Sequence, residues 1–312
     1  MNKKFFLGLL LLGLLVGCDN PTEINDGVPP PVIVNGSVGG ATFNGEGLAA
    51  FAKVQFIGID QYGQPQRNSE GEYLGQVYHT NENGVLENAQ ISGSYLGPLL
   101  VVASYDKYSE TVIDGESIER ETALTCPLPN GCVNENNEAV AFGDSFAPPA
   151  SFKLMAVVHE VTDPLTINVS PLTHLAAKLA FGDFISDGTS CDNSTCLADI
   201  FSKGLINAEK IYEANSRLQK QALINTGFPV NIAPWQSESI TDTVIQQDAA
   251  KHGLLSNVFF QDMVTRGEST QQVLDWWVDS YLVNKGQLIE DDQANAIKQL
   301  DFRHLFNGMN RF

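Results

Sequence analysis

Basic residues are scarce in this sequence. The 312 residues include 18 lysines and arginines against 37 aspartates and glutamates, so the formal net charge is −19 at pH 7. No cluster of basic residues offsets this imbalance, and such a chain is repelled by nucleic acids and by anionic lipid surfaces. We therefore expect no nucleic-acid partner. The acidic residues are scattered, which is typical of a solvated surface rather than of a dedicated cation site.

The sequence also lacks the common motifs of metal and phosphate sites. No glycine-rich loop is suited to cradle a phosphate, and the acidic run Glu290-Asp291-Asp292 lacks the central glycine and terminal glutamate of a calcium loop. Four histidines have no close metal-ligand neighbour, which favours surface or core-edge positions: His79, His159, His174 and His252. The pair Trp276–Trp277 could stack on a sugar ring, but its amphipathic segment favours at least one core side chain. We predict no metal and no cofactor.

The first eighteen residues have the order of an export signal. Lys3 and Lys4 precede an almost unbroken apolar stretch from Phe5 to Val16, which is too short and wrongly flanked for a stable membrane span. It ends in Leu15-Val16-Gly17-Cys18, which resembles the lipobox of bacterial lipoproteins. The resemblance implies a signal peptide over residues 1–17 and lipid (diacylglyceryl and a further acyl chain such as palmitate) on Cys18. The alternative is an ordinary signal peptide with a chance cysteine.

Residues 18–31 are expected to form a lipidated tether. Two or more acyl chains give stable membrane attachment where one gives only reversible binding. Pro29 to Pro31 favour an extended, semi-rigid spacer that holds the rest of the chain off the membrane. Asp19 resembles the signal that retains lipoproteins in the inner membrane of enteric bacteria, which favours that membrane while leaving the choice open.

Four cysteines remain once Cys18 carries lipid, and they fall into two close pairs. An even number in an exported protein predicts disulfides. We favour Cys126–Cys132 and Cys191–Cys196 among three possible pairings, because each intervening segment is a turn sequence. The alternative, a four-cysteine zinc site, normally has two to four residues between its paired ligands, and the first pair here has five.

The hydrophobic pattern changes character near residue 170. In residues 32–169, short apolar or alternating runs such as Ala52–Phe56 and Leu99–Ala103 are separated by clusters of Asn, Asp and Gly, which is typical of a β-sandwich. From Pro171 onward, apolar residues follow helical spacing, and Ser269 can cap a helix. The spacing therefore predicts an α+β protein, with a β-sandwich domain over residues 32–169 and a helical domain over residues 170–312.

Three short segments carry a resemblance to a group of bacterial envelope proteins. Thr80-Asn81-Glu82-Asn83-Gly84 is similar to the turn of their prealbumin-like or Ig-like β-domains, and Asn168–Ala177 is similar to the element that follows those sandwiches. Ala249–Leu254 looks like the helical segment after that element. The group includes surface adhesins and the accessory colonisation factor lipoproteins of vibrios. The resemblance implies a β-sandwich followed by helices, and a short or truncated member.

No catalytic residue is carried over by this resemblance. Some accessory colonisation factor lipoproteins carry a zinc peptidase motif His-Glu-x-x-His, whereas His159–Asp163 has no second histidine. A different enzyme alternative is a GDSL-like serine esterase, because Gly143-Asp144-Ser145 is similar to its nucleophile block and Asp301 with His304 to its base. The long β-like segment before the block, Pro148–Pro149 after it and the missing oxyanion block argue against this alternative.

We therefore predict a membrane-anchored envelope lipoprotein with a non-catalytic role. That role is binding, adhesion and colonisation, or assembly. The expected partners are the membrane, through the lipid anchor, and an envelope protein, a host surface or a glycan.

Overall fold

Strands come first in this chain and helices follow. The computed structural model describes residues 29–40, 47–66, 77–111, 115–181, 206–232 and 244–283. The strands are β1 (Val32–Val38), β2 (Ala49–Ala50), β3 (Lys53–Gly58), β4 (Tyr78–His79), β5 (Val85–Ile91), β6 (Leu99–Ser104), β7 (Lys107–Thr111), β8 (Ser117–Glu121), β9 (Ala123–Thr125), β10 (Cys132–Val133), β11 (Ala139–Val140), β12 (Ser145–Phe146), β13 (Lys153–Val158) and β14 (Leu165–Val169). The helices are α1 (Pro171–Phe181), α3 (Ala208–Gln221), the 3-10 helix η2 (Pro229–Asn231), α4 (Val244–Arg266) and α5 (Thr270–Val283). The predicted mixed α+β class, with a mainly C-terminal helical part, is confirmed.

Two sheets make up most of the β-part. One has four strands in the order β13-β6-β3-β4, all antiparallel to their neighbours. The other has the order β14-β1-β5, in which β1 runs parallel to β14 and antiparallel to β5. The parallel pair therefore joins the first and the last strand of the chain.

Alternation along the strands gives the four-stranded sheet two apolar faces. Val54 and Phe56 of β3 are fully buried and belong to a cluster that also contains Val34 of β1 and Ile167 of β14. The opposite face carries residues that form a second cluster with Phe181 of α1 and residues of α3: Ile57, Leu100, Met155 and Val157. Successive side chains of a strand point to opposite faces, so β3, β6 and β13 each supply both clusters.

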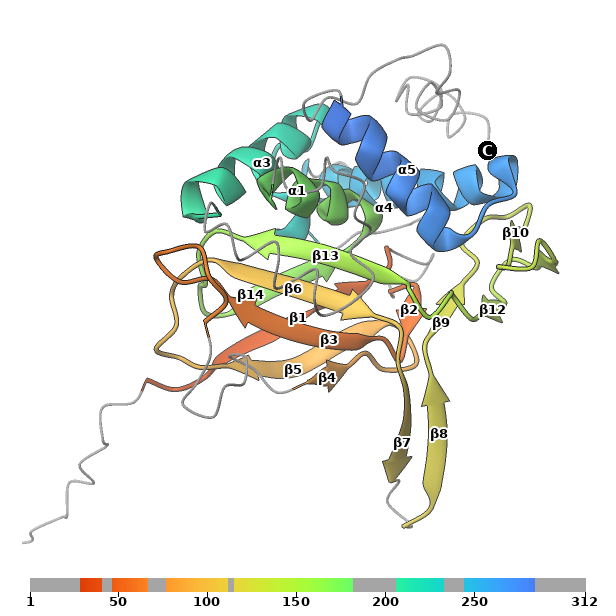
Figure 1. Ribbon diagram of the computed structural model, residues 1–312, viewed down its shortest axis with the longest axis horizontal. Helices are drawn as coiled ribbons and strands as arrows, with labels where there is room; N and C mark the ends of the chain where they lie inside the picture. The colour runs from red at the N-terminus through yellow and green to blue at the C-terminus, as the bar shows by residue number, and fades with distance from the viewer. Residues whose placement is uncertain are drawn as a thin grey trace, which may run out of the picture.

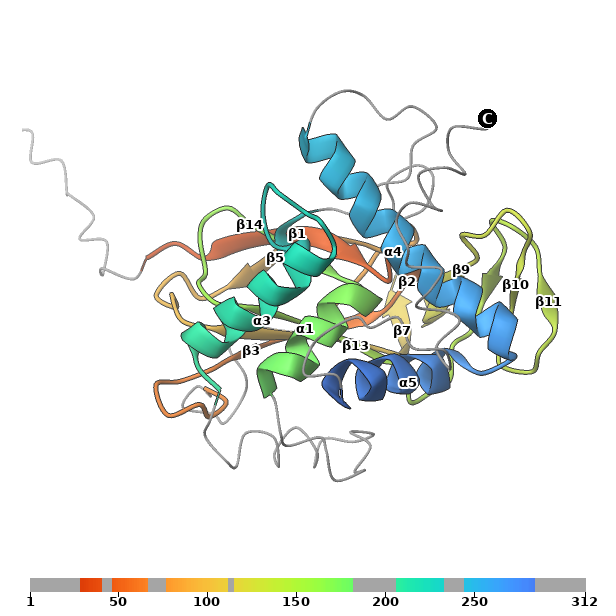
Figure 2. The same cartoon turned by 90° about the horizontal axis from the view of Figure 1, so that it is seen from above.

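The helices gather on one side of the molecule (Figures 1 and 2). Helices α1 and α3 cover the four-stranded sheet, and α4 and α5 lie beside them. Leu172 and Leu175 of α1, Phe259 of α4 and Trp277 of α5 belong to the large cluster that also contains residues of both sheets. Strands and helices are therefore packed around continuous apolar surfaces. None of the described helices combines the length and the hydropathy needed to cross a bilayer.

The predicted cap of the last described helix is confirmed. The Ser269 hydroxyl accepts a hydrogen bond from the Gln272 backbone N–H at 3.3 Å, and the Gln272 side chain accepts one from the Ser269 N–H at 2.9 Å. This reciprocal arrangement is a capping box, which satisfies two backbone donors at the start of α5.

The hairpin β7–β8 stands apart from the rest of the fold. It forms a two-stranded sheet of its own, and it projects from the body while β1 begins at the other end of the molecule (Figure 1). All ten of its strand residues are paired, in an unbroken antiparallel register from Lys107–Glu121 to Thr111–Ser117. Most of these side chains are exposed, so the hairpin contributes little to the core.

Candidate functional site

Several of the residues singled out by the sequence lie beyond what the structure describes. These are Cys18, Cys191, Cys196, Asp301 and His304, together with the acidic run 290–292. Cys126 and Cys132 are described, and they form a disulfide with a Cα–Cα distance of 5.7 Å. It closes the turn between β9 and β10, as the local pairing requires.

Ser145, the nucleophile of the esterase alternative, lies on the short strand β12. It pairs with Thr125 of β9, and its side chain is exposed. No described residue hydrogen-bonds to its hydroxyl, so the described part of the chain supplies no base for it. A serine hydroxyl is a weak nucleophile without such a base.

The histidines are more buried than their isolation in the sequence suggested. His174 on α1 and His252 on α4 are 2% and 0% exposed, so the expected surface or core-edge position is wrong for both. Each lies on a helix that is buried on more than one face. The apolar pattern of a short segment does not reveal such burial. His79 lies near the surface and pairs with Asp106 at 2.8 Å, and His159 packs edge-on against Tyr212 and Phe228.

Among the described residues, Ser170 and His252 most resemble a catalytic pair. Ser170 Oγ and His252 Nε2 are 2.8 Å apart, and His252 Nδ1 is 2.8 Å from the carbonyl oxygen of Ile232. A carbonyl only accepts, so Nδ1 carries the proton and Nε2 is the acceptor. The Ser170 hydroxyl therefore donates to the ring, as in a serine–histidine dyad.

Burial makes this pair a structural link rather than an active site. Both residues are 0% exposed, so no substrate reaches the hydroxyl. Ser170 also caps α1, since its Oγ accepts from Thr173 N–H at 3.3 Å while Ser170 N–H donates to Thr173 Oγ1 at 2.8 Å. Burial lowers the pKa of His252 to about 4, against the opposing effect of its bond to Ile232, so the ring is neutral near pH 7.

This link joins two segments that are 82 residues apart in sequence. One is the β14–α1 junction around Ser170, and the other is the start of α4 around His252. The sequence singled out both segments separately but contained no signal that they meet. The nearby Asn168 extends the junction, because its side chain accepts from Ser37 Oγ at 2.9 Å and donates to the Val230 carbonyl at 3.3 Å.

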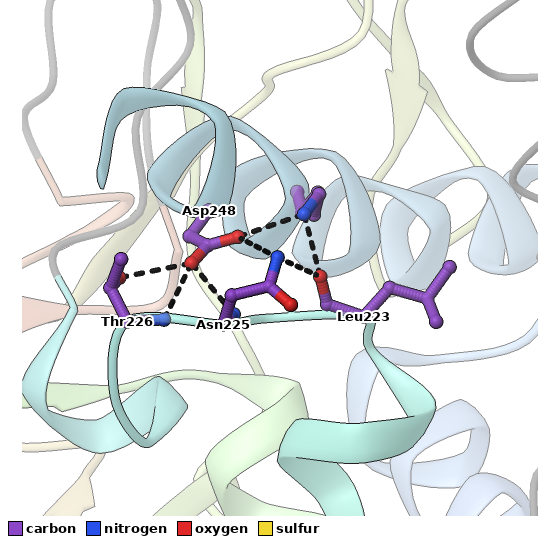
Figure 3. Close-up of polar contacts among 5 residues, drawn as sticks. Leu223, Asn225, Thr226 and Asp248 are labelled. Atoms are coloured by element: carbon purple, nitrogen blue, oxygen red, sulfur yellow. Dashed lines mark hydrogen bonds and ion pairs between the residues drawn. The ribbon is translucent and has the colours of Figure 1, made fainter. Parts of the chain in front are cut away.

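A second polar cluster surrounds Asp248 of α4 (Figure 3). Its carboxylate accepts from the backbone N–H groups of Asn225 and Thr226 at 2.7 and 2.8 Å, from Thr226 Oγ1 at 2.9 Å and from Lys251 Nζ at 2.8 Å. Burial would raise the pKa of Asp248, but the bonds from Lys251, Asn225 and Thr226 outweigh it and lower that pKa. Lys251 Nζ also donates to the Leu223 carbonyl at 2.6 Å. The polar groups of the cluster are hydrogen-bonded to one another, and these bonds hold the segment after α3 against α4.

Other buried polar groups are not satisfied. Both ring nitrogens of His174 lack a hydrogen-bond partner, and burial, helped by the charges of Lys178 and Lys153, lowers the pKa of His174 well below its usual value. Asp262 accepts from Trp277 Nε1 at 2.8 Å with one carboxylate oxygen, while the other oxygen has no partner. Burial raises the pKa of Asp262 to about 6.

The tryptophan pair divides between core and surface as the helical pattern predicted. Trp277 is 3% exposed and bonds to Asp262. Trp276 is half-buried, and the Arg266 guanidinium lies over its ring at 4.1 Å from the centroid. An arginine over the ring face is a cation–π contact, which occupies the surface that a sugar would stack on.

No group of three or more His, Cys, Asp or Glu side chains in the described ranges could hold a metal ion. The polar clusters of the helical part therefore connect elements of the fold to one another. The remaining candidate is a surface, the β7–β8 hairpin, whose turn Asp114-Gly115 was visible in the sequence while its projection from the body was not.

The base of the hairpin is tied firmly to the body. The Thr122 hydroxyl, fully buried, accepts from Asp106 N–H at 2.8 Å and lies 3.2 Å from the Phe51 carbonyl. Asp106 pairs with His79, whose ring stacks on Tyr108 with centroids 3.7 Å apart. Residues next to both strands, Asp106 and Thr122, therefore tie the base of the hairpin to the body.

Beyond its base the hairpin is an acidic ribbon with free edges. Among the described strands, neither β7 nor β8 has a second neighbour. The described residues of the ribbon carry four glutamates and two basic residues: Glu110, Glu116, Glu119, Glu121, Lys107 and Arg120. Cross-strand ion pairs, Arg120–Glu110 at 2.8 Å and Lys107–Glu121 at 3.7 Å, stabilise the ribbon and leave an excess of negative charge.

Neither known family models, curated proteins nor solved structures match this chain. Its function must therefore be argued from its own residues.

Proposed function

We propose that this chain is a lipid-anchored protein of the bacterial cell envelope with a non-catalytic binding role, and that the β7–β8 hairpin is its binding surface. The observation that carries the proposal is the projecting hairpin with two unpaired edges (Figure 1). Exposed strand edges are templates for pairing with another chain, and proteins normally cover or shorten them. An edge held out from the body is suited to accept a strand from a partner.

The charge of the hairpin indicates the kind of partner. Four glutamates against two basic residues favour an extended, basic segment of another envelope protein over an acidic one. Complementary charge accelerates encounter and sets the register, while main-chain hydrogen bonds to the free edge supply affinity. Exposed Ile118 adds apolar surface on the ribbon.

The anchor is proposed from Leu15-Val16-Gly17-Cys18 and from the tether that follows it. A partner-binding hairpin at the end of the molecule away from the start of β1 suits a protein held by its N-terminus (Figure 1). We further propose that the two sheets form a sandwich of the kind found in the envelope lipoproteins that the sequence resembles. The shared apolar cluster between the sheets supports this finer description.

Anchoring is tested by substituting the lipidated cysteine. Cys18→Ser should abolish palmitate labelling and block lipoprotein processing, because the thiol is the only attachment point that the motif provides. Unchanged labelling and membrane fractionation of the variant would contradict the proposal.

Binding is tested by placing a photo-crosslinking amino acid at exposed Thr111 of the hairpin in intact cells. We expect a discrete crosslinked band, weakened by the charge reversal Glu116→Lys. The matched control is exposed Thr265 on α4, which should yield no band. Equal bands from both positions, or none from Thr111, would exclude the hairpin as the binding surface.

The setting of the protein is tested by protease treatment of intact cells. Cleavage would favour adhesion or colonisation at the cell surface. Protection would favour an assembly role in the periplasm, in agreement with the inner-membrane signal suggested by Asp19.

A further inference from the structure

Two loops lie side by side at the end of the molecule where β1 begins. One follows β3 over residues 60–66, and the other precedes β6 over residues 92–98. They are joined where Ile59 N–H donates to the Pro98 carbonyl at 2.9 Å and lies 2.7 Å from the Tyr95 hydroxyl. Each carries a large apolar side chain at its tip, and both Tyr62 and Leu96 are 68% exposed.

These loops are ordered by their own hydrogen bonds. The Asp60 carboxylate accepts from the backbone N–H groups of Tyr62 and Gln64, both at 2.8 Å. Tyr95, 6% exposed, inserts its ring between the loops and so fixes the position of Leu96 next to it. The two apolar tips are therefore held outward by rigid turns, so little conformational entropy is lost when they bind.

The N-terminal segment leaves the fold at the same place. Val32 pairs with Ile91 at the end of β5, and Gly93 lies directly against the backbone of Pro30. A Cβ atom at Gly93 would sit 1.6 Å from the Pro30 carbonyl oxygen, so this contact requires glycine. Pro30 is about 12 residues from Cys18, and an extended chain of that length spans at most about 40 Å.

We infer that Tyr62 and Leu96 contact the bilayer surface and insert into its interface beside the lipid anchor. The backbone of Pro29 and Pro30 lies against Gly93, so these prolines are packed on the body and do not form the spacer that was expected to hold it off the membrane. This inference rests on the proposed lipidation of Cys18, which confines this end of the molecule to the neighbourhood of the membrane. Tyrosine is enriched at membrane interfaces, because its ring is apolar and its hydroxyl stays hydrated. Leucine buries apolar surface at the same depth.

The charge around the loops selects the lipid. The β13–β14 turn lies beside them, since Val161 N–H is 3.5 Å from the Leu96 carbonyl, and it carries exposed Glu160 and Asp163. These carboxylates are repelled by anionic headgroups. The surface is therefore suited to zwitterionic phospholipid, such as phosphatidylcholine or phosphatidylethanolamine.

Insertion is measured with the full lipidated chain in phosphatidylcholine vesicles that carry bromine on the acyl chains. Leu96→Trp and Tyr62→Trp each introduce a reporter at an exposed loop tip, and the signal of the three native tryptophans is subtracted with the unsubstituted protein. Ile118→Trp on the hairpin is the matched control, because Ile118 is also an exposed apolar residue. Thermal unfolding of each variant should match that of the unsubstituted protein.

We expect bromine to quench the added fluorescence of both loop variants by half or more and to leave the hairpin variant unchanged. Vesicle flotation of the same samples separates the two claims. Protein that floats with its loop reporters unquenched, or quenched no more than the hairpin reporter, overturns the interfacial contact and leaves the anchor intact. Protein that does not float overturns the anchor, and with it the contact that depends on the anchor.

Discussion

Ser170 shows how one hydroxyl holds together parts of the chain that are distant in sequence. It caps α1 through Thr173 and donates to the neutral ring of His252. Removing it leaves a backbone N–H and a buried ring nitrogen without their partner. Losing an N-cap costs about 0.5–2 kcal/mol, and leaving a buried acceptor unpaired costs about 1–3 kcal/mol.

We therefore expect Ser170→Ala to lower the free energy of unfolding by about 1.5–5 kcal/mol, as the sum of these two effects. Urea denaturation followed by circular dichroism measures the change. Ser145→Ala is the matched control, because Ser145 is exposed and its substitution should change stability by less than about 0.5 kcal/mol. A similar loss in both variants would mean that Ser170 has no special structural role.

The same control variant separates a binding protein from an esterase. The purified mature protein should not hydrolyse short acyl esters above background, and a fluorophosphonate should not label Ser145. Measurable turnover that disappears on Ser145→Ala or His304→Ala, by orders of magnitude, would establish the esterase instead.

Asp262 is a buried carboxylate with one oxygen unpaired, which makes it a destabilising group at neutral pH. Its folded pKa, about 6, exceeds the ordinary value of 3.8, so the unfolded chain holds the charge more readily. Asp262→Asn should raise the free energy of unfolding at pH 8 by about 1–3 kcal/mol, since one pKa unit corresponds to about 1.4 kcal/mol. The gain should shrink as the pH falls from about 6 toward about 4, where the folded wild-type carboxyl takes up its proton.

Asp279→Asn on the exposed side of α5 is the control for Asp262→Asn and should leave the free energy of unfolding unchanged at both pH values. Chemical denaturation at pH 8 and pH 4.5 gives the difference in unfolding free energy between each of the two variants and the wild type at each pH. A gain that is equal at the two pH values would show that ionisation of Asp262 is not its cause.

At the scale of elements, the hairpin depends on its base rather than on its own packing. An isolated two-stranded ribbon is marginally stable in water. The Thr122 hydroxyl ties both ends of the ribbon to the body through Asp106 and Phe51. Thr122→Val keeps the shape of the side chain and removes these bonds.

We expect Thr122→Val to accelerate amide hydrogen exchange in β7 and β8 by about tenfold, since one hydrogen bond is worth about 1 kcal/mol or somewhat more. Exchange in β3 and β6 should change much less. Uniform acceleration across all four strands would indicate global destabilisation and would contradict a local role at the hairpin base.

The local disulfide acts on the next element along the chain. Joining Cys126 to Cys132 restricts a loop of only a few residues in the unfolded chain, which predicts a stabilisation of about 2 kcal/mol. The double substitution Cys126→Ala and Cys132→Ala should lose about that much.

Non-reducing peptide mapping should recover this pair and the Cys191–Cys196 pair, which lies outside the described residues and stays a prediction. Cross-pairing, free thiols or bound zinc would refute the assignment.

For the whole molecule, the buried histidines set the response to acid. The pKa of His252 is about 4 in the folded protein and that of His174 is also lowered, while both return to ordinary values near 6.5 on unfolding. The unfolded chain therefore binds more protons below about pH 6.5, and stability is lost as the pH falls from about 6.5 toward about 4.

His252 alone should contribute about 3 kcal/mol to this loss, from a shift of about 2.5 units. Asp262 acts in the opposite direction over the same range, so the measurement is cleanest in the Asp262→Asn background. Unfolding free energies at pH 7.5, 6, 5 and 4.5 should fall steadily there. A flat profile would show that His252 is accessible to protons in the folded protein.

Local patterns in the sequence were enough to predict the order of strands and helices. Alternation placed Val54 and Phe56 inside, the change in spacing near residue 170 matched the start of α1 at Pro171, and Ser269 capped α5 as expected. The nearby pairing of Cys126 with Cys132 was also visible, because a turn sequence brings its own ends together. All these features arise from interactions between residues close in the chain.

Tertiary structure alone decided which distant residues meet. The burial of His174 and His252, the link from Ser170 to His252 and the clamp on Asp248 depend on packing between elements that are 22 to 82 residues apart. The same holds for the surfaces, since the projection of the hairpin appears only in the folded chain and the adjacency of Tyr62 and Leu96 follows from the pairing of β3 with β6. The proposed lipid anchor is the reverse case, because its signal is a short linear sequence that does not depend on the fold.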